Sequence, residues 1–149
     1  MTRCVGFDVG GTHVRAVATW TTHGDGGTPS WQQGPAVRAT WRGHSDTAAP
    51  PVAALGDVLR DLATEAIAAA DQTATPGDTW RYGVGVAAQL DRDARRVVNA
   101  PNIGWRDVAL AEGLEAALGG SVVLVNDVNA ILLGEVAFGA ARGERDVLA

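Results

Sequence analysis

The sequence contains no lysine, because all twelve of its basic residues are arginine. A Walker-type phosphate loop needs a lysine that reaches the terminal phosphates, so that class of nucleotide enzyme is excluded. Seventeen acidic residues leave a net charge of −5, which argues against nonspecific binding to nucleic acid or to an anionic membrane. We therefore expect the partners to be small molecules rather than nucleic acid or membrane.

Cysteine is almost as scarce, with Cys4 as its single occurrence. One cysteine excludes an internal disulfide framework and a cysteine-based zinc site, and it fits a reducing compartment such as the cytoplasm. No apolar run approaches the ~18 residues of a membrane span, and the N-terminus lacks the apolar core of a signal peptide. Of the three histidines, His23 and His44 fall in predicted loops, where a solvated role is expected.

What the sequence does contain is the periodicity of an α/β domain. At 149 residues it has the length of one domain, which buries about 68–70% of its unfolded surface. Alternating apolar residues predict strands at 3–9, 13–20, 31–41 (weaker, because Gly34 and Pro35 interrupt it), 80–90 and 121–125. Helical spacing predicts helices over 52–66, 108–118 and 127–138.

Turn and cap residues separate these elements. Pro50 and Pro51 open the first helix, Asp107 is expected to cap the second, and Gly119 with Gly120 ends it. Residues 22–30, 42–51 and 75–78 are predicted to be turns or linkers. The resulting order is β-β-β-α-β-α-β-α, a five-stranded mixed sheet with helical crossovers. Ligands in such sheets bind at the carboxyl ends of the strands.

The stretch "GFDVGGTHVRAV" places the carboxylate of Asp8 just before Gly10 and Gly11. The two glycines predict a β-hairpin, because glycine reaches positive φ without steric cost. A hairpin does not need Asp8, which could stabilise the turn by bonding to nearby backbone N–H groups. The functional alternative is that the turn's N–H groups cradle phosphate oxygens while Asp8 holds magnesium, directly or through water.

A second polar group follows the last predicted strand, in "LVNDVNAILLGE". Asp127 stands at a strand-to-helix junction, where aspartate is common simply as an N-cap. Its neighbours Asn126 and Asn129 add two more polar side chains at the same strand end. Such convergence is typical of a ligand site and not of a single cap.

Together these motifs resemble the ROK family of sugar kinases and repressors, in the actin-like ATPase superfamily, and most closely its bacterial glucokinases. The resemblance is carried in order by "GFDVGGTH", "GVGVAAQLD", "NAPNIGWRDVAL" and "VNDVNAILLGEVAFGAARG", and it covers nearly the whole chain. It implies an actin-like, ribonuclease H-like domain. It also implies an activity, the transfer of phosphate from ATP to the 6-hydroxyl of glucose or a related hexose.

The resemblance implies a role for each matching residue. Asp8 with Gly10, Gly11, Thr12 and His13 would form the first phosphate motif and handle Mg²⁺ and ATP. Asn126 and Asp127 would hold the sugar, and Asp127 would be the catalytic base. A carboxylate within about 2.6–3.2 Å of the sugar hydroxyl could orient that hydroxyl and accept its proton.

The sequence departs from the family pattern at two of these motifs. Members usually carry lysine after the Gly-Gly-Thr, whereas His13 lacks that permanent charge, so phosphate attraction weakens unless Arg15 or a protonated His13 compensates. Glucokinases commonly have glycine where Gln89 stands, beside Ala88, at a strand end that lies against the sugar. Asn102 could contact the sugar, although a turn role after Pro101 is equally open.

The largest departure is that the chain ends at "RDVLA", where the family continues into a second domain. That domain would supply the second phosphate loop, the adenosine pocket, and the residues that bind zinc, so zinc is expected only there. The complete protein would be a homodimer, and these 149 residues alone would be inactive. The rival interpretations are a sugar-sensing regulator of the same family and a non-catalytic fragment. Such regulators usually carry a DNA-binding helix pair before the first strand, where this sequence has none, so we favour the enzyme.

Overall fold

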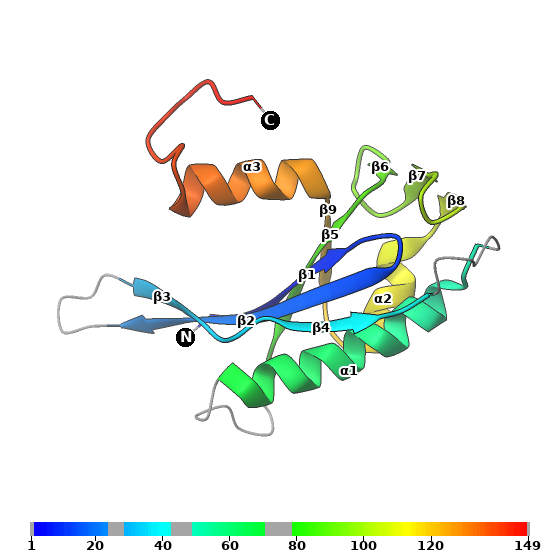
Figure 1. The fold of residues 1–149 in the computed structure, drawn as a ribbon, viewed down its shortest axis with the longest axis horizontal. Coiled ribbons are helices and arrows are strands. Elements are labelled where there is room, and N and C mark those ends of the chain that lie inside the picture. Colours follow the sequence, from blue (N-terminus) through cyan, green and yellow to red (C-terminus); the bar gives the residue numbers. More distant parts are fainter. Residues whose placement is uncertain (1, 24–28, 43–48, 71–78, 149) are drawn as a thin grey trace.

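The computed structural model describes residues 2–23, 29–42, 49–70 and 79–148. Parts of the predicted turns at 22–30 and 42–51, with His44, and all of the linker 75–78 lie outside these residues. The chain forms one mixed sheet with helices on both faces, and a small second sheet at one edge (Figure 1). The predicted α/β class is therefore confirmed.

The main sheet has the strand order β3-β2-β1-β5-β9, with β4 also paired to β2. β1 runs antiparallel to β2 and parallel to β5, which is in turn parallel to β9. The bounds of these strands are β1 Arg3–Val9, β2 His13–His23, β3 Pro29–Gln33, β4 Val37–Thr40, β5 Arg81–Val86 and β9 Val122–Asn126. The predicted first strand matches β1 in both of its ends.

The main sheet has six strands where the sequence predicts five, because the expected strand at 31–41 is divided. β3 pairs with Thr19–His23 and β4 with His13–Ala16, so both lie along the long strand β2. The prediction of a turn over 22–30, with His23 in a loop, was wrong at both ends, because β2 extends to His23 and β3 begins at Pro29. The division falls at Gly34 and Pro35, where proline has no N–H to continue the ladder. A short break in sequence thus becomes two collinear edge strands.

A three-stranded sheet between β5 and α2 was not predicted. It consists of β6 Gln89–Leu90, β7 Val97–Ala100 and β8 Trp105–Val108, in that order. Strands of two to four residues are too short to show the alternation from which strands are predicted. This small sheet stands beside the carboxyl end of β5 (Figure 1).

The helices are α1 Val52–Ala70, α2 Leu110–Leu118 and α3 Asp127–Phe138. α1 and α2 pack together on one face of the sheet, and α3 lies on the other (Figure 1). The expected cap of α2 was wrong: Asp107 belongs to β8 with a φ of 52°, and its carboxylate accepts a bond from Arg96 at 2.9 Å. The helix begins at Leu110, and Gly119, at a φ of 67°, ends it as predicted.

The hydrophobic core lies between the sheet and the helices α1 and α2. Its fully buried side chains include Val5, Val9, Val14, Leu55, Leu59, Val84, Val86, Leu110 and Leu114. α3 contributes no buried residue, and its large apolar side chains are exposed at Val128, Ile131, Leu133, Val136 and Phe138. Among the described residues, no helix is long and apolar enough to cross a membrane.

The parallel strands end together. Val9 pairs with Val86, which pairs with Asn126, so the last residues of β1, β5 and β9 stand side by side. The turn after β1, the segment after β5 and the start of α3 therefore share one edge of the sheet. This is the edge where ligands bind in sheets of this kind.

Candidate functional site

The turn after β1 is closed by the backbone N–H of Gly10, which donates to the His13 carbonyl at 2.9 Å. The hairpin is as predicted, but the reason for its glycines is different. The positive-φ glycines among the described residues are Gly104, Gly119 and Gly143, so neither turn glycine is in that region. A Cβ on Gly11 would lie 3.1 Å from the Asn102 carbonyl oxygen. Close backbone approach, and not backbone conformation, is what calls for glycine there.

Asp8 lies near the end of β1 with its side chain exposed on the face away from the core. Within the part of the chain that the structure describes, its carboxylate has no hydrogen-bond or ion-pair partner. The turn-stabilising alternative is therefore not what the structure shows. Asp8 lines a cavity of about 450 Å³ together with Gly10, Gly11, Thr12, His13, Arg15 and Asn102.

The described residues contain no group of three or more acidic, histidine or cysteine side chains that could enclose a metal. A single free carboxylate beside a glycine turn nevertheless suits magnesium. Mg²⁺ keeps several waters and is usually held by one or two carboxylates plus substrate phosphates. Asp8 thus fits a magnesium ion that arrives with a phosphate chain.

The N-cap of α3 is Asn126, so the capping role considered for Asp127 belongs to its neighbour. The Asn126 side-chain oxygen accepts from the N–H groups of Val128 at 3.0 Å and Asn129 at 3.3 Å. Its amide nitrogen donates to the Ala88 carbonyl at 3.0 Å. Asn126 therefore fastens the start of α3 to the segment after β5, and one of its amide hydrogens remains for a ligand.

This arrangement leaves Asp127 available for chemistry. One carboxylate oxygen, Oδ1, accepts from the Val128 N–H at 2.9 Å, and no bond is formed by Oδ2 within the described residues. The residue is half-buried at the first turn of α3. A carboxylate with one oxygen anchored and the other free has the geometry that a general base needs.

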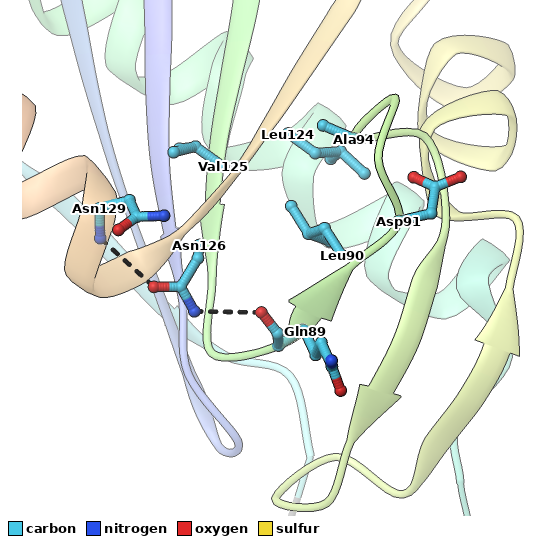
Figure 2. A pocket seen from close by; sticks show the side chains of 9 residues that line it. Gln89, Leu90, Asp91, Ala94, Leu124, Val125, Asn126 and Asn129 are labelled. Atoms are coloured by element: carbon cyan, nitrogen blue, oxygen red, sulfur yellow. Dashed lines mark hydrogen bonds between the residues drawn. The ribbon is translucent and has the colours of Figure 1, made fainter.

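Ala88, Gln89 and Asn126 line a cavity of about 560 Å³ beside the small sheet, with Asp91 and Asn129 as further polar members (Figure 2). Gln89 is exposed and follows Ala88, whose carbonyl accepts from Asn126, and Figure 2 shows the Gln89 side chain extending away from Asn126. Gln89, which departs from the family pattern, therefore lines the same cavity as Asn126, a predicted sugar contact.

A charged network that was not predicted from sequence holds the wall of this cavity in place. The Asp91 carboxylate accepts the N–H groups of Arg95 at 2.8 Å and Arg96 at 3.0 Å, and these bonds lower its pKa. Arg95 also makes a two-point ion pair with Glu115 of α2, at 2.9 and 2.6 Å. That pairing, with the Val122 N–H at 3.2 Å, lowers the pKa of Glu115 to about 2.

A second set of contacts, also not predicted from sequence, connects the turn at residues 10–13, here called the phosphate turn after its predicted role, to the loop after β7. The Trp41 indole N–H donates to the Gly10 carbonyl at 2.9 Å, and its ring lies 5.8 Å from that of Trp105. The next residue, Arg42, donates to the Ile103 carbonyl at 2.8 Å. Residues before α1 thereby hold the two walls of the Asp8 cavity in register.

The predicted site residues fall into adjoining hollows along one edge. Asn102 lies in a turn after β7 and lines the same cavity as residues 10–13. It does not line the cavity that contains Ala88 and Gln89. Asp8 and Asp127 line a shared cavity of about 520 Å³, with Gly85 between them. A Cβ on Gly85 would lie 3.9 Å from the Asp127 Cα, so this glycine lets α3 approach the sheet.

The strand order, the hairpin turn and the helix starting at the adjacent strand end define an actin-like ATPase fold. A ROK family glucokinase from Streptomyces griseus, solved with glucose and AMPPNP, superposes with a TM-score of 0.61 and 29% identity. The match covers 95% of this chain and 38% of that one. Residues 32–149 match the model of the ROK family, and the chain belongs to that family.

The curated relatives include both kinases and regulators. The glucokinase of Streptomyces coelicolor is 41% identical over 85 residues, which is 56% of this chain and 27% of that protein. The xylose repressor of Bacillus subtilis is 26% identical over 144 residues, 97% of this chain and 33% of that protein. The chain thus spans about a third or less of the length of these relatives.

Proposed function

We propose that this chain is the N-terminal domain of an ATP-dependent sugar kinase that phosphorylates glucose, or a related hexose, at the 6-hydroxyl. The observation that carries the proposal is that Asp8 and Asp127 line one cavity at the strand ends, next to the phosphate turn. The identity to the S. coelicolor glucokinase supports the kinase over other activities.

The residues divide the work by position. Asp127, with its free oxygen, would orient the sugar hydroxyl and take its proton, while Asn126 positions the start of α3 and offers one amide hydrogen. Ala88, Gln89 and Asn102 would complete the sugar side. Magnesium bound to ATP would neutralise charge on the transferring phosphate; Asp8 would hold it, and the turn of residues 10–13 would contact the phosphate oxygens.

The relatives' greater length supports the proposal that a second domain completes the protein. It would supply the adenosine pocket and the expected zinc site, in a cytoplasmic homodimer. Closing two domains excludes water from the transferring phosphate, which a single open face cannot do.

A sugar-sensing regulator is the second candidate, because the B. subtilis xylose repressor matches 97% of the chain. Both candidates would bind sugar, and turnover and DNA binding separate them. The full-length natural protein should release ADP in a coupled assay when glucose or another hexose is added.

Asp127→Asn is the matched control for this assay, since asparagine keeps the oxygen that accepts from Val128. Loss of a general base typically costs about 10²–10⁴ in rate, with the fold intact by circular dichroism. Retention of more than half the wild-type rate would reject Asp127 as the base. Sugar binding with operator DNA binding and no turnover would favour the regulator.

A further inference from the structure

Two arginines stand next to Asp8 in a row that crosses the sheet. Asp8 of β1 pairs with Arg15 of β2, and Arg15 pairs with Arg38 of β4. All three side chains are exposed, whereas the flanking residues of β1 and β2 are buried against α1 and α2. The row therefore lies on the face where α3 begins, in line with Gly85, which pairs with Asp8 on its other side.

The arginine pair is unfavourable for the chain by itself. Like charges directly opposite one another on antiparallel strands destabilise the pairing. In the described ranges, neither Arg15 nor Arg38 has a hydrogen bond or an ion pair, whereas Arg60, Arg95 and Arg96 each pair with a carboxylate. Asp8 can offset the charge of only one of these arginines, so the row keeps a net positive charge that a bound anion would stabilise.

We propose that Arg15 and Arg38 form a binding site for a chain of linked phosphates, continuing the site of Asp8 and the phosphate turn. The inference rests on the proposed function, and it deepens that function by assigning the donor contacts. Arg15 already lines the cavity of Asp8 and the turn. Arg38 lies two strand spacings from Asp8, roughly 10 Å along the row, so the site suits linked phosphates better than orthophosphate.

The chemistry of guanidinium suits this ligand. Arginine is always charged and can donate two parallel hydrogen bonds to phosphate oxygens, which lysine cannot do. The site would also supply positive charge beside the turn, where His13 stands in place of the lysine that the family usually carries. The linked phosphates can come from a nucleoside triphosphate or from inorganic polyphosphate, which the experiment separates.

The test is calorimetric titration of the full-length natural protein with Mg-tripolyphosphate, Mg-ATP and orthophosphate at one low ionic strength. Arg15→Gln and Arg38→Gln should each weaken tripolyphosphate binding about tenfold, the loss expected for one hydrogen bond to a charged group. Arg60→Gln is the control: it removes the same charge from α1, on the opposite face, and should change nothing.

The effect of the two arginine variants on ATP affinity distinguishes a nucleoside triphosphate from inorganic polyphosphate as the source of the linked phosphates. If ATP affinity falls in parallel, the nucleotide's phosphates occupy the row; if tripolyphosphate alone is affected, the row serves an inorganic chain. Both results support the site. Failure of the wild type to bind tripolyphosphate, or equal binding by the wild type and both arginine variants, would overturn it.

A stability measurement excludes a merely structural role. Because the arginines repel one another, Arg38→Gln should leave the ligand-free melting temperature unchanged or raised, and it should reduce the increase caused by tripolyphosphate. A lowered ligand-free melting temperature with an unchanged ligand effect would contradict the proposal. Phosphate binding without hexose turnover would reject the kinase activity and leave this site in place.

Discussion

At the scale of single residues, the side chains that hold the site in place differ from those available for chemistry. Asn126 caps α3 and bonds to the Ala88 carbonyl, so the neighbouring Asp127 needs only one oxygen to hold its place. The Asp8 carboxylate has no hydrogen bond or ion pair among the described residues. Two carboxylates that the fold does not require thus line one cavity. Charged side chains that do not stabilise the fold are expected where a ligand binds.

Replacing Asp8 should change the kinetics in a different way from replacing Asp127. Asp8→Ala in the full-length protein should raise the KM for Mg-ATP and lower turnover, while glucose binding survives, because Asp8 faces the phosphate turn. Steady-state kinetics with each substrate varied, together with glucose calorimetry, measures the split. Asp61→Ala, an exposed change on α1, is the control. A collapse of glucose affinity along with activity would count against the separation.

At the scale of elements, the sequence was informative where a pattern is long. β1 and α1 were predicted closely because their seven and nineteen residues repeat one period. The small sheet was missed because its strands are two to four residues long. The candidate residues were predicted from motifs, but their supports were not: Arg95 meets Glu115 twenty residues away, and Trp41 meets Gly10 thirty-one away. Contacts at such separation leave no local pattern.

The Trp41 bond is expected to position the phosphate turn. Trp41→Phe keeps a ring against Trp105 but removes the donor to the Gly10 carbonyl. One such bond contributes about 0.5–1.5 kcal/mol, so we expect a similar loss of stability and a several-fold rise in the donor KM. Trp31→Phe, on exposed β3, is the matched control. If the KM for glucose rises as much as that for the donor, the change acts on general stability and not on the turn.

The ion pair between α2 and the wall of the sugar-side cavity predicts a pH dependence. The pKa of Glu115 is lowered to about 2 in the folded chain, below the ordinary value of about 4.3. Its contribution to stability is therefore complete above the ordinary pKa and is lost as pH falls from there towards 2. Denaturant midpoints of the wild type and Glu115→Gln should differ at pH 6, and the difference should shrink as pH falls from the ordinary pKa towards 2. A difference that stays constant through this window would argue that the charge is irrelevant; Glu65→Gln controls for a surface carboxylate.

At the scale of the whole molecule, the two faces of the sheet are unequal. α1 and α2 cover one face with a continuous core, whereas α3 buries none of its residues and exposes Ile131, Leu133 and Phe138. Phe138 meets the exposed Trp31 edge to face, with ring centres 6.5 Å apart, above the start of β1. Exposed apolar surface of this extent on one helix is typical of an interface. The relatives' greater length is consistent with further chain covering it.

This asymmetry gives the last prediction, that the 149-residue chain alone has no kinase activity and self-associates. The hollows that hold Asp8, Gln89 and Asp127 all lie along one edge of the sheet, so a bound sugar would keep several hydroxyls in water and ATP would meet no opposing wall. Light scattering should show association that decreases in Ile131→Gln and Phe138→Gln, because α3 lies outside the core. A coupled ATP assay at high protein concentration measures activity, and glucose titrations followed by tryptophan fluorescence measure binding. Turnover above the blank without any added domain would show that one face suffices, and the two-domain assignment of roles would then be wrong.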